Sequence, residues 1–469
     1  MVKEKRPNFV FLMETISTKH RMELLRVKMG FAGALVVNPV GRSGGLALMW
    51  KDDWFYGNPE TAKREESWLL LRHLKTHAPL PWLCVGDFNE ILSQDEKVGE
   101  VVRRERQMDA DDTLPTKYFI NCGSKSNIIV GGRNFVGDLN SGSFSVGPSS
   151  TVSAINSSTD TCLYQTARVF TNPSSYEFDI TDHGIYYVRL HFFPFTSGST
   201  NLANAQFDVS SSSFSLLSNF GVKKNSNSPV IEEFLLTING SKFDIHFSPH
   251  SNSFAFVSAI EVFLIPDKDF VMDDFPLVTA AGSSETYVGV RSQFLRTIHR
   301  VNVGGPQNND TLWRNWIPDD GYLLSQGSAK TCVPYKGELT YDVLGATLYS
   351  ASDVVYRTCK ELNSNSSNIT WRFGVNKNTR HLVRLHFCDI VSAEDAFVRF
   401  DLSIYSKFSQ MIYPDDANGI EQLAAPFYYD FVVDSDDSGV MNISVGPRQD
   451  SKNKNAYLNG LEILEFARK

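Results

Sequence analysis

The sequence has no apolar run long enough to span a bilayer. The best candidate, Phe254–Ile265, is about 12 residues long and carries Glu261, whereas a spanning helix needs about 20 residues. Positive charge is also not in excess, because 45 Lys and Arg stand against 53 Asp and Glu. Phosphate contacts need concentrated Lys and Arg, so we expect no nucleic-acid partner. The short apolar stretch near residue 10 has no small-residue cleavage site after it, so no signal peptide is evident.

Cysteine is scarce, with six residues in 469, and none of the spacings is typical of a structural zinc site. Five of the six lie beyond residue 116, so at most two disulfides can form there. The local pairings are Cys122–Cys162 and Cys332–Cys359, although spacing alone does not decide the connectivity. A buried free thiol is an equally good interpretation of any one of them. We expect no metal ion or other cofactor in this part of the chain.

A length of 469 residues exceeds what one hydrophobic core supports, so several domains are expected. Positive and negative charges balance before residue 116, which assigns the net charge of −8 to the remainder. A polar run that contains Asp109–Asp112 and ends at Pro115 comes directly before the apolar residues 118–120. We place a domain boundary there and predict that residues 1–112 form a separate fragment.

An internal repeat dominates the rest of the chain. Residues 188–192 and 383–387 both read Val-Arg-Leu-His-Phe, and four further matches keep the same order, among them 259–262 with 460–463. Apolar and polar residues alternate within these segments, which is typical of β-strands. Turn-forming residues every 8–12 positions favour antiparallel β-sandwiches.

The predicted fold is therefore mainly β, with two tandem β-sandwiches after an incomplete α/β fragment. The predicted domains are residues 113–266 and 299–469, joined by a linker at 267–298.

The landmarks Lys117–Ser124, Tyr164–Phe170, Val188–Pro194, Phe207–Val209 and Phe254–Phe263, followed by a second divergent copy, carry a family resemblance. Residues 113–466 resemble the tandem malectin-like ectodomain of plant receptor-like kinases of the FERONIA type. The resemblance implies an extracellular or plasma-membrane-associated module that senses a peptide hormone or the cell wall. It also implies rapid alkalinisation factor peptides as ligands, bound with a small glycosylphosphatidylinositol-anchored partner. Neither a membrane span nor a kinase follows in this chain.

Six Asn-x-Ser/Thr sequons agree with an extracellular location, and all of them lie beyond residue 116. The candidate glycosylation sites are Asn156, Asn239, Asn309, Asn365, Asn368 and Asn442.

No nucleophile–base signature is present in the repeated part, so we predict that it is not an enzyme. His191 and His386 recur at equivalent positions, which favours a shared packing or hydrogen-bonding role over catalysis. Trp313, Trp316 and the run Phe427–Tyr429 could stack on sugar rings, but core or interdomain packing is the preferred interpretation. The resemblance does not supply a residue-by-residue match to the sugar site of animal malectin.

The N-terminal fragment carries a different pattern. Glu14 follows an apolar strand, and Asp87 and Asn89 follow another, which places oxygen ligands where a magnesium ion could bind. This order resembles the endonuclease/exonuclease/phosphatase domain of plant non-LTR retrotransposons. The strand end that supplies the family's catalytic base is missing, so we expect the site to be vestigial and the fragment inactive.

Together these observations predict a non-catalytic ligand-binding module. The alternatives are a lectin-like protein that binds cell-wall polysaccharide and, less favoured, a magnesium-dependent phosphodiesterase.

Overall fold

The structure is a computed structural model, and its chain divides into two compact units, residues 1–107 and 108–469. It describes short stretches before residue 51 and most of the chain from residue 117 onwards. The described residues are 9–13, 21–22, 25–26, 28, 31, 33–37, 46–50, 117–139, 144–147, 150–153, 162–212, 214–222, 228–341, 344–392, 397–413, 423–451 and 453–469. Among them, no helix is long and apolar enough to cross a membrane.

In the first unit, three strands form an antiparallel sheet in the order β1-β3-β2. They are β1 (Phe9–Met13), β2 (Gly33–Val37) and β3 (Leu46–Trp50). The predicted magnesium ligands Glu14, Asp87 and Asn89 lie outside the described residues. The interpretation of this fragment as a nuclease remnant therefore stays a prediction.

The second unit is built from two groups of strands, which we call the first half (residues 117–265) and the second half (residues 266–469). In the first half, one sheet has the strand order β15-β14-β17-β10-β7. Its strands are β7 (Phe144–Val146), β10 (Ser174–Asp179), β14 (Phe207–Ser211), β15 (Phe214–Phe220) and β17 (Lys242–Pro249). The opposing strands are β4 (Lys117–Asn121), β5 (Ile128–Val130), β6 (Arg133–Gly137), β11 (Gly184–Phe192), β16 (Val230–Ile238) and β19 (Ala259–Leu264).

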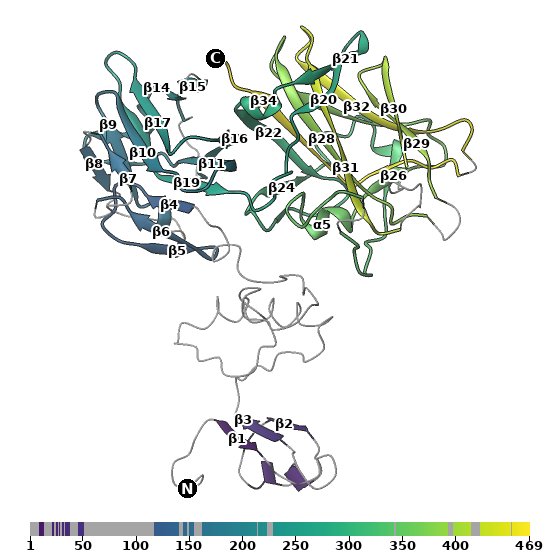
Figure 1. Cartoon of the computed structure of the whole chain (residues 1–469), viewed down its shortest axis with the longest axis horizontal. Coiled ribbons are helices and arrows are strands. Elements are labelled where there is room, and N and C mark those ends of the chain that lie inside the picture. Colours follow the sequence, from purple (N-terminus) through teal and green to yellow (C-terminus); the bar gives the residue numbers. More distant parts are fainter. Residues whose placement is uncertain are drawn as a thin grey trace. The chain divides into compact units, whose positions relative to one another are not determined.

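The second half repeats this plan. Its outer sheet has the order β27-β32-β29-β30, formed by β27 (Ile369–Gly374), β29 (Phe400–Ile404), β30 (Phe408–Ile412) and β32 (Val440–Pro447). The opposing strands are β20 (Asp274–Thr279), β21 (Gly282–Val288), β22 (Leu295–Asn302), β28 (Arg380–Cys388), β31 (Pro426–Asp434) and β34 (Gly460–Phe466). Strand β28 lies between β31 and β34, as β11 lies between β16 and β19 (Figure 1).

Short elements complete the second unit. The strands are β8 (Ser150–Ser153), β9 (Thr166–Phe170), β12 (Thr196–Ser197), β13 (Thr200–Asn201), β18 (Ala255–Val257), β23 (Asn308–Asn309), β24 (Asn315–Pro318), β25 (Ala329–Thr331), β26 (Lys360–Leu362) and β33 (Tyr457–Leu458). The helical turns are η3 (Cys162–Tyr164), η4 (Leu202–Asn204), η5 (Val290–Ser292), η6 (Gln326–Ser328) and α5 (Asp353–Tyr356).

Alternation explains how each half is packed. Val188, Leu190 and Phe192 on β11 enter the core between the two sheets, while Arg189 and His191 point to the opposite face. That opposite face is covered as well, since Arg189 and His191 are both only 3% exposed. The mainly β fold predicted from the sequence is confirmed.

One sheet continues from the first half into the second, because β16 pairs with β22 through Phe234–Arg296 and Leu235–Leu295. The segment predicted as a linker, residues 267–298, contains ordered strands. Residues in it form the β20–β21 hairpin, and β20 pairs in parallel with β31 at the edge of the same sheet. Backbone pairing with a distant strand orders this segment.

Candidate functional site: buried polar centres and an open polar groove

A buried polar centre lies on the outer face of β11 in the first half. His191 Nδ1 is 2.9 Å from the hydroxyl of Tyr164, and its Nε2 is 2.8 Å from Glu261 Oε1. Glu261, which is fully buried on β19, also accepts hydrogen bonds from Arg133 and from Arg189. Burial alone would raise the pKa of Glu261, but the two arginines outweigh it and hold that pKa well below its usual range.

The second half contains a matching centre. His386 Nδ1 is 2.8 Å from the hydroxyl of Tyr356, and its Nε2 is 3.3 Å from Glu462 Oε1. Arg300 Nε donates to Glu462 Oε2 at 2.7 Å, and Arg314 lies 3.6 Å from Oε1. Burial lowers the pKa of His386, against the opposing effect of Glu462, which favours the neutral imidazole. His386 and Glu462 are 0% and 2% exposed, so the predicted hydrogen-bonding role of the histidine is confirmed.

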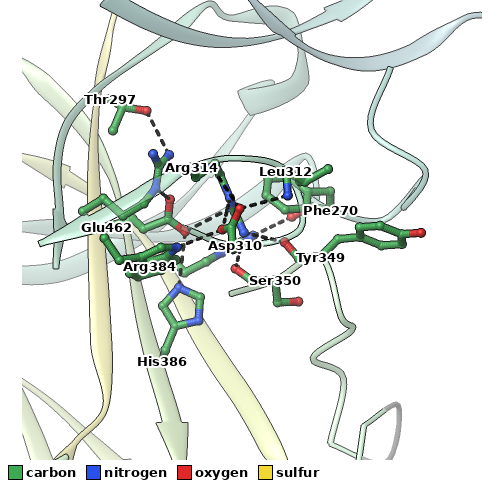
Figure 2. A network of polar contacts seen from close by, with 12 residues as sticks. Phe270, Thr297, Asp310, Leu312, Arg314, Tyr349, Ser350, Arg384, His386 and Glu462 are labelled. Atoms are coloured by element: carbon green, nitrogen blue, oxygen red, sulfur yellow. Dashed lines mark hydrogen bonds and ion pairs between the residues drawn. The ribbon is translucent and has the colours of Figure 1, made fainter. Parts of the chain in front are cut away.

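Figure 2 shows how charged side chains converge beside this second centre. Arg314 Nε donates to Asp310 at 2.6 Å, and both side chains are fully shielded from solvent. Arg314 Nη2 donates to the carbonyl oxygens of Tyr349 and Ser350, and Nη1 donates to the hydroxyl of Tyr187 at 3.4 Å. Trp316 Nε1 also donates to Asp310, at 2.8 Å. Since buried charges are costly unless paired, this network fixes residues 310–316 to the segment that contains Tyr349 and Ser350.

The two halves meet through a second set of charges. Glu233 on β16 accepts hydrogen bonds from Arg189 within the first half and from Arg300 and Thr297 on β22 in the second half. Burial would raise the pKa of Glu233, but Arg300 and Arg189 lower it to about 2. An ionised carboxylate therefore joins the two halves beside the β16–β22 pairing.

The candidate sugar-stacking aromatics are packing residues. Trp316 is fully buried, and Phe427 is 5% exposed. Trp313 packs edge-on against Phe119 and Phe263 of the first half, with ring centroids 5.8 and 5.7 Å apart. Core and interdomain packing, the interpretation preferred from the sequence, is confirmed for Trp313 and Trp316.

An open groove of about 630 Å³ crosses the outer sheet of the second half. Its floor is a row of hydroxyl side chains in register, in which Thr370 on β27 lies opposite Ser444 on β32, and Ser444 lies opposite Ser403 on β29. The Thr370 and Ser444 hydroxyls are hydrogen-bonded at 2.8 Å. The other lining residues are Ala280, Ser367, Asn368, Asp401, Tyr405, Ser406, Asp436, Asn442, Val445, Gly446 and Pro447.

Tyr405 follows β29 with a left-handed backbone, at φ 57°, and its buried hydroxyl has no hydrogen-bond partner within the part of the chain that is described. A non-glycine residue in this conformation is strained and is often found at binding sites. Its backbone N–H donates to the carbonyl oxygen of Asn442 at 2.9 Å, which holds the turn beside β32.

Two of the cysteines form a disulfide, and two others are free thiols. Cys332 and Cys359 form a disulfide with their Cα atoms 5.2 Å apart. Cys122 is a free, fully buried thiol, so the Cys122–Cys162 pairing is wrong. Its side chain belongs to the core between the sheets, where burial, followed by Asp138, raises the pKa of the thiol well above its usual range. Cys388 is likewise buried and free.

Of the six sequon asparagines, Asn239, Asn309, Asn365, Asn368 and Asn442 are all exposed. Asn156 lies outside the described residues, and glycosylation stays a prediction for all six. No cluster of three His, Cys, Asp or Glu side chains with the geometry of a metal site occurs in the described ranges.

Two features of the site were missed from the sequence. Glu261 and Glu462 occupy matching places in the repeat, 259–262 with 460–463, and a carboxylate inside an apolar strand is a recognisable sign of a buried ion pair. The groove left no such sign, because Thr370, Ser444 and Ser403 come together only through strand register.

The paired, mainly antiparallel sheets, with a hydrophobic core between them, place this part of the chain in the class of β-sandwich proteins. Residues 120–466 match the family described as Malectin-like domain, so the chain belongs to the malectin-like family.

Among curated relatives, the chain is 36% identical over 366 residues to the receptor-like protein kinase HERK 1 of Arabidopsis thaliana, covering 74% of this chain and 42% of that protein. It is 34% identical over 372 residues to the receptor-like protein kinase THESEUS 1 of the same plant, covering 75% and 42%. The chain therefore spans under half the length of the curated relatives that it matches.

Solved structures share this fold. The plant receptor-like kinase FER matches with a TM-score of 0.63 and 26% identity, over 76% of this chain and 97% of that one. The extracellular domain of ANXUR1 from Arabidopsis thaliana matches with a TM-score of 0.65 and 24% identity, over 75% and 97%. A chain from the crystal structure of the plant peptide RALF23 in complex with FER and LLG2 matches with a TM-score of 0.61 and 26% identity, over 75% and 96%.

Proposed function

We propose that this chain acts as a non-catalytic extracellular recognition module, which binds a peptide hormone together with a membrane-anchored co-receptor. The observation that carries the proposal is the match, over three quarters of the chain, to FER in its complex with RALF23 and LLG2. The closed polar centres support it, because His191 and His386 are engaged with buried partners. An acidic chain with a net charge of −8 also favours a basic ligand.

Calorimetry tests this function directly. The full chain is titrated with RALF23 peptide in the presence and absence of LLG2, with a scrambled peptide of the same composition as the control for net charge. We expect the chain to bind RALF23 but not the scrambled peptide, and we expect LLG2 to increase the affinity for RALF23. Binding of neutral cell-wall oligosaccharides without any response to the peptide would instead establish the lectin-like alternative.

Binding of cell-wall polysaccharide is a second candidate, and the open polar groove is the observation that favours it. Hydroxyl and amide side chains line the groove, and they can replace the water around a sugar. Asp401 and Asp436 lie in the same lining, which disfavours an acidic polymer and favours a neutral one.

The matching strand pairings and matching Tyr-His-Glu centres support a tandem duplication, with malectin-like copies at residues 113–266 and 299–469. We propose that residues 1–112 descend from a truncated endonuclease/exonuclease/phosphatase domain and are inactive. A plasmid-nicking assay with magnesium tests this, and we expect no cleavage. Cleavage that Asp87→Ala abolishes would revive the phosphodiesterase function.

A further inference from the structure

The groove on the second half has sequons built into its walls. Asn442-Ile443-Ser444 lies within β32, and Asn368-Ile369-Thr370 enters β27. The isoleucines at the middle of both sequons are fully buried, so the flanking asparagine and hydroxyl residues face the groove. Both asparagines are exposed.

Strand register brings the two sequons together. Thr370 pairs with Ser444, and their hydroxyls are bonded at 2.8 Å, so the hydroxyl residue of each sequon contacts that of the other. Asn442 stands between Arg372 on β27, its register partner, and Tyr405 beyond the end of β29. Asn442 lies on the central strand β32, two residues before Ser444, so it is next to the row of hydroxyls formed by Thr370, Ser444 and Ser403.

The corresponding face of the first half has a different chemistry. There β17, which like β32 lies between two other strands, carries Asp244 and His246, which are hydrogen-bonded to each other. Lys242 on the same strand pairs with Glu177. To bind an uncharged ligand, this face would have to remove water from the exposed Lys242–Glu177 pair, whereas the floor of the groove on the second half is built from hydroxyls.

We propose that the groove holds an N-linked glycan attached to Asn442 of this same chain. N-acetylglucosamine residues present hydroxyl and acetamide groups, which match the donors and acceptors of Thr370, Ser444 and Ser403. A volume of about 630 Å³ is within the roughly 300–1,000 Å³ of small-molecule sites, so the first sugars fit along the floor. This assignment rests on the proposed extracellular location. If the glycan fills the groove, a cell-wall polysaccharide cannot bind there.

The covalent step is the transfer of an oligosaccharide from a lipid pyrophosphate donor. The side-chain nitrogen of Asn442 forms a bond to the anomeric carbon of the donor, and the bond from that carbon to the pyrophosphate oxygen breaks. The leaving pyrophosphate takes the electron pair, and the amide loses one proton to a base. The donor and the transferase belong to the secretory pathway.

The full chain, fused to a secretion leader and produced in a glycosylating host, provides the test. Glycopeptide mass spectrometry measures occupancy at Asn442 and at Asn239, an exposed sequon in the turn after β16 that serves as the matched control. A time course with an endoglycosidase under native conditions then measures the release of each glycan. We expect release at Asn442 to be about tenfold slower than at Asn239, which corresponds to about 1.4 kcal/mol of contact.

Two variants distinguish a glycan that contacts the groove from a glycan that is attached to Asn442 without contacting it. Ser403→Arg places a bulky side chain on the floor and keeps the sequon, so release at Asn442 should rise to the rate at Asn239. Ser444→Thr keeps both sequon and hydroxyl, so the slow release should persist. Circular dichroism confirms that each variant is folded.

An unoccupied Asn442 beside an occupied Asn239, or equal release rates at the two sites, would overturn the proposal. So would binding of added chitobiose to Asn442→Gln with no protection of the attached glycan in the parent chain, because the occupant would then be a free sugar. Peptide binding is measured on the same preparation. Its failure beside a protected Asn442 glycan counts against the proposed function alone.

Discussion

Glu233→Gln should destabilise the junction of the two halves by about 3 kcal/mol at pH 7. Glu233 accepts hydrogen bonds from Arg189, Arg300 and Thr297, and the variant removes its charge without changing its shape. The folded-state pKa is lowered from 4.5 to about 2, and each pKa unit is worth about 1.4 kcal/mol. Breaking a buried ion pair typically costs 3–5 kcal/mol, and the lower end applies because both arginines keep another carboxylate.

Urea unfolding of the full chain, followed by tryptophan fluorescence, measures this loss. The carboxylate pKa is depressed in the folded state, so its contribution is fully present above about pH 4.5. It is lost as the pH falls through 4.5 toward 2. The difference between parent and variant should therefore shrink on acidification.

Glu177→Gln is the matched control for Glu233→Gln. It removes one partner of the exposed Glu177–Lys242 pair and should leave the unfolding midpoint unchanged. A loss below about 1 kcal/mol for Glu233→Gln at pH 7, or a loss independent of pH, would refute the reasoning.

Three further predictions concern stability. Replacing both Cys332 and Cys359 by serine opens a bridge between residues 27 positions apart, and calorimetry should show a loss of about 3–4 kcal/mol. Gly304→Ala should cost about 2 kcal/mol or more in urea unfolding, because φ is +71° and the new Cβ would lie 2.1 Å from a carbonyl oxygen; Gly321→Ala, which meets nothing within 4 Å, is the control and should be close to neutral. Burial lowers the pKa of His381 to about 4, so thermal stability should fall as the pH drops from 6.5 toward 4. His381→Phe should flatten that slope, and an unchanged slope would show that another group titrates.

Local pattern was sufficient where each strand carries its own signal. The shared residues of 188–192 and 383–387 predicted β11 and β28, because alternation is a property of consecutive residues. The β20–β21 hairpin was not predicted. Strand β20 pairs in parallel with β31, and the sequence near residue 274 contains no signal for a partner so far along the chain.

The polar centres were predictable in part. The sequence favoured a hydrogen-bonding role for His191 and His386, but not their partners Tyr164 and Tyr356. Those tyrosines lie 27 and 30 residues away from the histidines, and only the packing of η3 and α5 beside the strands brings the pairs together. The register that builds the groove is a tertiary property in the same sense.

The β16–β22 pairing has a consequence for how a bound ligand could be sensed. Two domains on a free tether can swing apart, but here main-chain hydrogen bonds and the carboxylate of Glu233 clamp one to the other. A hinge at this point would have to break them. A ligand that binds either half should therefore move both halves together as one rigid body. The C-terminal strand β34, which pairs with β22, should move with them.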